Sequence, residues 1–98
     1  MNIEKNCNEN SITLKVSGRL DTTTAPSLEN AVSEAVGSCE YLILDFANLE
    51  YISSAGLRVI LKAQKAMMSK GGMQVQHVGE TIMEIFEITG FSDILTIV

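Results

Sequence analysis

The sequence predicts a single α/β domain over residues 1–98, built on a mixed β-sheet of four to five strands with helices packed on it. The expected order is β-β-α-β-α-β-α-β. Segments with period-two hydrophobicity alternate along the chain with segments of helical periodicity, and this alternation is the first observation behind the prediction. The second is size: 98 residues, 46% hydrophobic and 19% charged, suit one packed core. Connections of helical length favour right-handed parallel crossovers.

The N-terminal segment is expected to be a β-hairpin. Residues 12–17 place Ile12, Leu14 and Val16 in alternation with polar side chains, which is typical of a half-buried strand. Residues 8–10 are turn formers, so residues 3–5 are expected to pair with this strand as an edge strand.

A first helix and a central strand follow. Pro26 marks the start of the helix and Gly37 its end, with apolar residues at helical spacing between them. Residues 41–44 are continuously apolar, which indicates a central strand buried on both faces and ended by Asp45.

The longest predicted helix covers residues 54–70 and is stopped by two glycines. Its apolar stripe consists of Leu57, Ile60, Leu61 and Met68. A fourth strand is expected over residues 73–78, and a capping box at residues 81–84 opens a third helix that ends before Gly90. Residues 94–98 are expected to form the last strand.

Charge and hydropathy exclude several classes of function. A formal net charge of −5 repels phosphate backbones, so direct nucleic-acid binding is not expected. No apolar run approaches the length of a membrane helix, so no membrane insertion is expected. Met1 is not followed by a signal-peptide core, which favours a cytoplasmic location. Cys7 and Cys39 are then expected to remain free thiols.

Residues 51–57 form the sharpest local segment, because they join a buried strand to the long helix. Ser53 and Ser54 therefore lie at a helix start, where backbone N–H groups lack intrahelical partners and the dipole is positive. A phosphate added there would be stabilised. The alternative is that one of the serines is an ordinary N-cap. Gly56, unfavourable inside a helix, suits a close approach of backbone or of a partner.

Residues 45–61, with Ile52-Ser53-Ser54-Ala55-Gly56-Leu57-Arg58 at their centre, resemble the signature segment of STAS domains. The bacterial anti-sigma factor antagonists of that family are the most similar. Residues 18–21, followed by Thr24-Ala25, resemble the second recurrent segment of the family, and Gly90-Phe91 also fits. The resemblance extends over the whole chain, so it implies one STAS domain, 1–98.

The resemblance implies a switch at Ser54, the serine ahead of a small residue, glycine and leucine. In the family this serine is phosphorylated by an anti-sigma factor that is a serine kinase. The unphosphorylated antagonist binds that kinase and frees a sigma factor, and a serine phosphatase restores binding. The implied partner-binding residues are Asp21, Thr22, Ser53, Ser54, Gly56, Leu57 and Arg58. The chain itself is then not an enzyme and needs no cofactor or metal.

Some alternatives remain open. Many members of the family carry aspartate where this chain has Ser53, which leaves open whether Ser53 is a second phosphate acceptor. Arg58 either docks the partner or is simply solvated. The chain could also be a STAS module of another signalling or lipid-transport complex, with Ser54 only capping its helix. A hydrolase with Ser54 as nucleophile would have to use His77 alone as base, which disfavours it.

Overall fold

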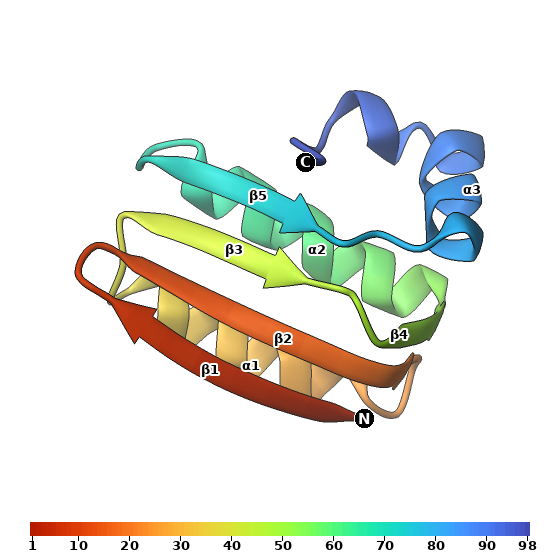
Figure 1. The fold of residues 1–98 in the computed structure, drawn as a ribbon, viewed down its shortest axis with the longest axis horizontal. Helices are drawn as coiled ribbons and strands as arrows, with labels where there is room; N and C mark the ends of the chain where they lie inside the picture. The colour runs from red at the N-terminus through yellow and green to blue at the C-terminus, as the bar shows by residue number, and fades with distance from the viewer.

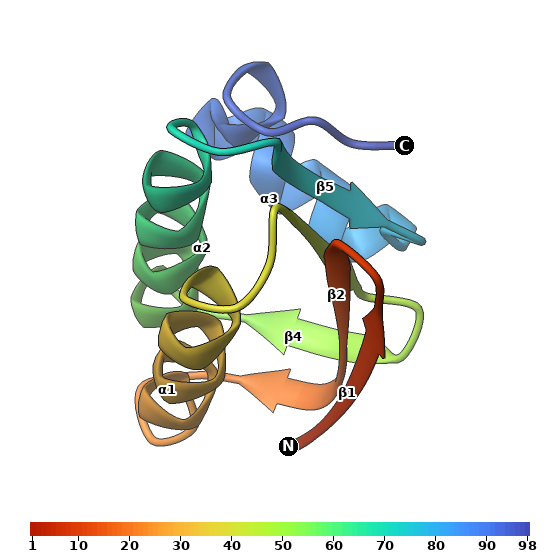
Figure 2. The ribbon, with the colours of Figure 1, turned by 90° about the vertical axis from the view of Figure 1, so that its left-hand side faces the viewer.

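The computed structural model describes all residues 1–98 as a five-stranded mixed sheet with three helices, which confirms the predicted fold class (Figure 1). The elements in chain order are β1 (Asn2–Asn8), β2 (Ser11–Leu20), α1 (Ala25–Val36), β3 (Tyr41–Asp45), β4 (Leu49–Ile52), α2 (Ser54–Met67), β5 (Gly72–Gln76) and α3 (Glu80–Thr89). A 3₁₀ turn, Phe91–Asp93, follows α3. Helices α1 and α2 lie side by side on one face of the sheet, and α3 lies beyond the end of β5 (Figures 1 and 2).

The long strand β2 organises the sheet. It pairs with β1 in antiparallel fashion from Ser11 to Ser17 and with β3 in parallel fashion over its first half. Its last residues, Gly18 to Leu20, pair in parallel with β4, with a register shift between Gly18 and Arg19. The order within the sheet is β1-β2-β3-β5, with β4 on the far half of β2. The sequence prediction lacked β4, because four residues without regular alternation carry no strand signal of their own.

The core lies between the sheet and the two helices. Alternate residues of β2, β3 and β5 point toward the helices and are almost fully buried: Ile12, Leu14, Val16, Leu42, Leu44, Met73 and Val75. The prediction that β3 is buried on both faces was wrong, since Tyr41 is 48% exposed and Ile43 is half-buried. Both helices cover the same face, which leaves these side chains on the open one.

Helix α2 is shorter than predicted. It ends at Met67, and Met68, expected on the buried stripe, is 71% exposed. The chain turns there toward β5. Lys70 lies in that turn and donates hydrogen bonds to Val36 O and, at 2.7 Å, to Cys39 O, so it ties the turn to the end of α1.

The C-terminal region also differs from the prediction. Helix α3 follows Gly79, and no side-chain capping bond forms at its start, so the capping box is absent. Gly90 ends the helix as predicted, with a φ of 82° that favours glycine. In place of a last strand, Ile97 forms a single parallel bridge to Val75.

None of the helices combines the length and the apolar character that a membrane crossing requires.

Candidate functional site

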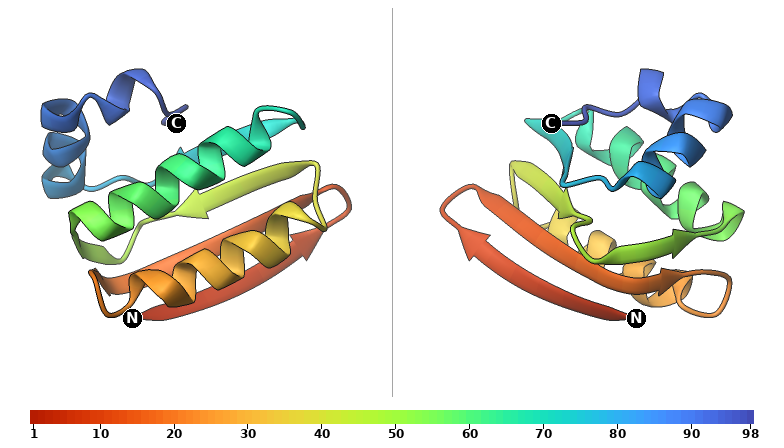
Figure 3. Two further views of the ribbon diagram at one scale, coloured as in Figure 1. Left: turned by 180° about the vertical axis from the view of Figure 1, so that it is seen from behind. Right: turned by 45° about the vertical axis from the view of Figure 1, so that its right-hand side comes forward.

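Two helix starts meet at one end of the sheet. The last residues of β2 and β4, Leu20 and Ile52, are register partners, so Asp21 and Ser53 begin neighbouring segments. The Ser53 N–H donates to Leu20 O at 2.9 Å and joins the two. Helices α1 and α2 then run side by side from this end (Figure 3). The structure thus brings together the two segments that the sequence singled out separately.

The start of α1 is closed by its own chain. Asp21 Oδ1 accepts the N–H groups of Thr23 and Thr24 at 3.0 and 3.1 Å, and the Thr23 hydroxyl at 2.8 Å. The Ala25 N–H donates to Asp21 O at 2.8 Å. The Thr24 hydroxyl accepts the Asp21 N–H at 2.8 Å and donates to Arg19 O at 2.8 Å. The Asp21, Thr23, Thr24 and Ala25 N–H groups of this turn are therefore all paired within the turn.

The Asp21 carboxylate is held ionised by these contacts. The hydrogen bond from the Thr23 hydroxyl is the main cause that lowers the pKa of Asp21, and the Thr24 bonds act in the same direction against partial desolvation. Arg19 adds an ion pair, with Nε 3.9 Å from Asp21 Oδ2, and its guanidinium stacks 4.2 Å from the centre of the Tyr51 ring. Asp21 therefore organises its own loop.

The start of α2 is open. Its N-cap residue, Ser53, forms no side-chain capping bond, and the first turn contains no acidic residue. The first backbone bond runs from the Leu57 N–H to Ser53 O at 3.0 Å. The N–H groups of Ser54, Ala55 and Gly56 find no acceptor in the chain. This turn combines unpaired donors with the positive end of the helix dipole, an arrangement that favours an anion.

The two serines at this start differ in accessibility. Ser54 is exposed, as the first residue of the helix. The Oγ atom of Ser53 is buried and has no hydrogen-bond partner. Of the two hydroxyls, only that of Ser54 is open to another protein.

Gly56 and Leu57 lie beneath this surface, and both are buried. A Cβ atom on Gly56 would lie 2.6 Å from Leu20 Cγ and 3.0 Å from Ile52 Cγ1. The glycine lets α2 approach the ends of β2 and β4, which is an internal reason for its presence. The sequence had suggested a close approach by backbone or by a partner, and the structure shows the approach of the chain to itself.

Thr22 and Arg58 line a groove of about 240 Å³ between the first turns of α1 and α2. Both are exposed, and the groove contains apolar atoms of Pro26 and Ala55. Further along, the Lys62 ammonium and the Glu29 carboxylate form an ion pair of 2.5 Å between the two helices. The predicted partner-binding residues thus gather at one end of the molecule. Two of them, Gly56 and Leu57, are buried beneath the surface that the others form.

A second pair of polar groups lies elsewhere, and sequence reasoning missed it. His77 Nδ1 lies 2.9 Å from Asp45 Oδ1, which also accepts the Ala47 N–H at 3.0 Å. Burial raises the pKa of Asp45, but the bonds from His77 and Ala47 outweigh it and lower the pKa below its usual value. Asp45 is the last residue of β3 and lies on the open face of the sheet, where its register partner on β2 is Lys15. His77 is engaged there, and Ser54 starts a helix on the other face.

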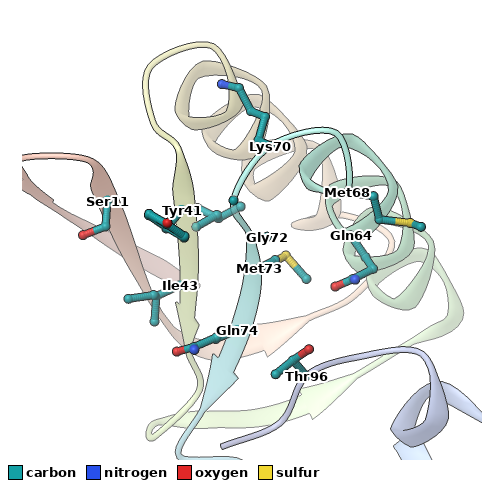
Figure 4. A pocket seen from close by; sticks show the side chains of 12 residues that line it. Ser11, Tyr41, Ile43, Gln64, Met68, Lys70, Gly72, Met73, Gln74 and Thr96 are labelled. Atoms are coloured by element: carbon teal, nitrogen blue, oxygen red, sulfur yellow. The ribbon is translucent and has the colours of Figure 1, made fainter.

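A hollow of about 510 Å³ lies near the N-terminal end of β5 (Figure 4). Its lining includes Tyr41, Gln64, Met68 and Gly72. Gln64 belongs to the C-terminal half of α2, several turns after Ser54, and Tyr41 and Gly72 belong to β3 and β5. The hollow is therefore separate from the site at the helix starts.

Fold and site define a small α/β module that presents an exposed serine at an open helix start. The family model described as STAS domain matches residues 2–98. The anti-sigma-B factor antagonist of Bacillus subtilis (strain 168) is 28% identical over 98 residues, covering 99% of this chain and 90% of that protein. The anti-sigma F factor antagonist of Paenibacillus polymyxa is 30% identical over 100 residues, with coverages of 99% and 86%. The chain belongs to the STAS domain family.

Solved structures share the fold. A crystal structure of an anti-sigma factor antagonist from Mycobacterium paratuberculosis superimposes with a TM-score of 0.89 at 24% identity, covering 98% of this chain and 83% of that one. The anti-sigma factor antagonist SpoIIAA in its unphosphorylated form gives a TM-score of 0.84 at 15% identity, with coverages of 99% and 88%. Bacillus SpoIIAA in its phosphorylated form gives 0.77 at 16% identity, with coverages of 99% and 91%.

Proposed function

We propose that this chain is an anti-sigma factor antagonist of the cytoplasm, a protein-binding module without enzymatic activity of its own. With Ser54 unphosphorylated it binds an anti-sigma factor that is a serine kinase, and a sigma factor is released. Phosphorylation of Ser54 ends the binding, and a serine phosphatase restores it. The observation that carries the proposal is the exposed Ser54 hydroxyl at the open start of α2. The names of the full-length relatives support it.

The assignment to Ser54 is supported by burial. A kinase must bring the γ-phosphate of ATP to the hydroxyl oxygen, and the Ser53 Oγ is closed to solvent. The alternative in which Ser54 only caps the helix is disfavoured, since the N-cap position belongs to Ser53 and Ser54 is already helical. The alternative function, a STAS module of another complex, explained Ser54 as a helix cap, and that explanation is no longer needed.

Phosphate at this position should leave the fold intact. It carries a charge of about −1.5 to −2, and a single negative charge near a helix N-terminus typically contributes about 0.3–1 kcal/mol of stability. The same group must lose its water in an interface, where an unmatched buried charge costs about 2–5 kcal/mol. The interface penalty exceeds the gain within the domain. SpoIIAA, whose fold this chain shares, has been solved in both states.

The experiment is to co-purify the partner from the native cell, incubate it with this chain and ATP, and map the phosphopeptides. We expect the label on Ser54, retained in the Ser53→Ala variant and lost in Ser54→Ala. Both residues lie in one turn, so the two variants are a matched pair. Label on Ser53 in the parent protein, or label that survives Ser54→Ala, would show that the assignment is wrong.

A further inference from the structure

Arg58 lies one helical turn after Ser54 in α2, and both residues are exposed. Residues four apart in a helix share a face, with Cβ atoms about 5–6 Å apart. A long side chain in a helix leans back toward the N-terminus, over the preceding turn. The Arg58 side chain is therefore long enough, and on the right face, to reach a group attached to the Ser54 oxygen.

Arg58 is also a cation without a partner. It forms no ion pair or side-chain hydrogen bond, although the chain has a net charge of −5. The other cations of this end are engaged: Lys62 is paired with Glu29, and Arg19 lies against Asp21 and Tyr51. An anion that arrives at Ser54 thus finds one free guanidinium beside it.

We propose that Arg58 receives the phosphate of Ser54, through an intrahelical pair that the unmodified protein lacks. This inference rests on the proposed function only for the origin of the phosphate. A guanidinium can bind two phosphate oxygens through parallel N–H bonds, which a lysine ammonium cannot imitate. The free N–H groups of the first turn of α2 supply further donors to a phosphate at this helix start.

The pair changes the groove between α1 and α2. In the unmodified protein the Arg58 side chain lines this groove and is free to meet a partner. After phosphorylation the same side chain is neutralised and held over the first turn. The modification therefore adds a charge and also removes a cation from the docking surface.

The test uses the full chain with phosphoserine installed at position 54 by genetic encoding, so that no kinase is required. The second pKa of the phosphate is measured by ³¹P NMR titration in the parent, in Arg58→Gln and in Lys65→Gln. The Lys65 control removes an equal charge from the same helix at a point about 16 Å from Ser54 along the helix axis, which is beyond a Debye length at moderate salt. Melting curves verify that each variant is folded.

We expect the second pKa of the Ser54 phosphate in the parent protein to lie below its usual value of about 6. Arg58→Gln should raise this pKa by about 0.5–1 unit. Lys65→Gln should shift it by less than about a third of that amount, because its charge is screened. The Arg58 side-chain N–H resonance should also move on phosphorylation. Equal titration curves for the parent and Arg58→Gln, or equal shifts in both variants, would overturn the pair. A kinase that ignores Ser54 would instead contradict the proposed function and leave this result standing.

Discussion

The starts of α1 and α2 lie side by side at the same end of the sheet, yet they are built in opposite ways. Around α1, the Asp21 carboxylate and backbone oxygen accept the donors of the turn, and Pro26 has no N–H to satisfy. Around α2, the N-cap side chain forms no hydrogen bond and three backbone N–H groups are free. The first arrangement holds the loop together, and the second leaves donors available for something outside the chain. Three predictions test this division.

The largest effect is expected from phosphate on Ser54. Affinity for the anti-sigma partner should fall by roughly thirty- to several-thousand-fold, because the charge must be desolvated in the interface. The melting temperature should hardly change, since the phosphate lies at a favourable helix end. Calorimetry measures the affinity for the partner and circular dichroism measures the melting temperature, each on the unmodified and on the Ser54-phosphorylated protein. A collapse of the melting transition would mean that the switch acts by unfolding, and unchanged affinity would mean that Ser54 is no switch.

A smaller effect is expected from Gly56→Ala, which places a methyl group against Leu20 where α2 meets the strand ends. Overpacking of this kind costs typically about 1–3 kcal/mol, measured here as the free energy of unfolding in urea. Gly37→Ala is the matched control at the end of α1, because a Cβ there makes only ordinary contacts, at 3.7 Å or more. Equal stabilities of the two variants would contradict the close approach of α2 to β2.

The smallest effect concerns pH and separates the two starts directly. Because the folded-state pKa of Asp21 is lowered, its contribution is present above the unfolded value of about 3.9 and is lost as pH falls through the folded value. Below that pH the Thr23 amide, which donates to the Asp21 carboxylate, should lose protection against hydrogen exchange. The Ala55 amide should exchange quickly throughout, since it has no acceptor.

Two controls accompany the pH measurement. Asp45 also has a lowered pKa and affects global stability in acid, so His77→Gln should raise the pH of acid unfolding without changing exchange at Thr23 before unfolding begins. Ser53→Ala should alter stability by no more than about 0.5 kcal/mol, because its Oγ forms no bond. Protected Thr23 amides at low pH in a folded protein would show that Asp21 does not hold the loop.

Several features were predictable because their signals are local. The period-two pattern of residues 12–17 and the helical pattern between Pro26 and Gly37 correspond to β2 and α1. The serine segment was also located at the start of a helix, at Ser54. Strand β4 was not predictable, because it is stabilised by pairing with β2 and not by its own pattern. Met68 was misplaced for a similar reason, since the point where α2 ends depends on the turn to β5.

The amino-acid sequence alone determined the fold class, the order of the long elements and the segment that carries Ser54, because periodicity and stop signals act over a few neighbouring residues. Only the tertiary structure decided which serine is reachable, since Ser53 and Ser54 are adjacent in sequence and yet the Ser53 Oγ is buried while Ser54 is exposed. The tertiary structure also makes Asp21 and Ser53 neighbours, through the pairing of Leu20 with Ile52. It likewise brings His77 into hydrogen-bond contact with Asp45. These relations join segments about 30 residues apart, and no local pattern encodes such contacts.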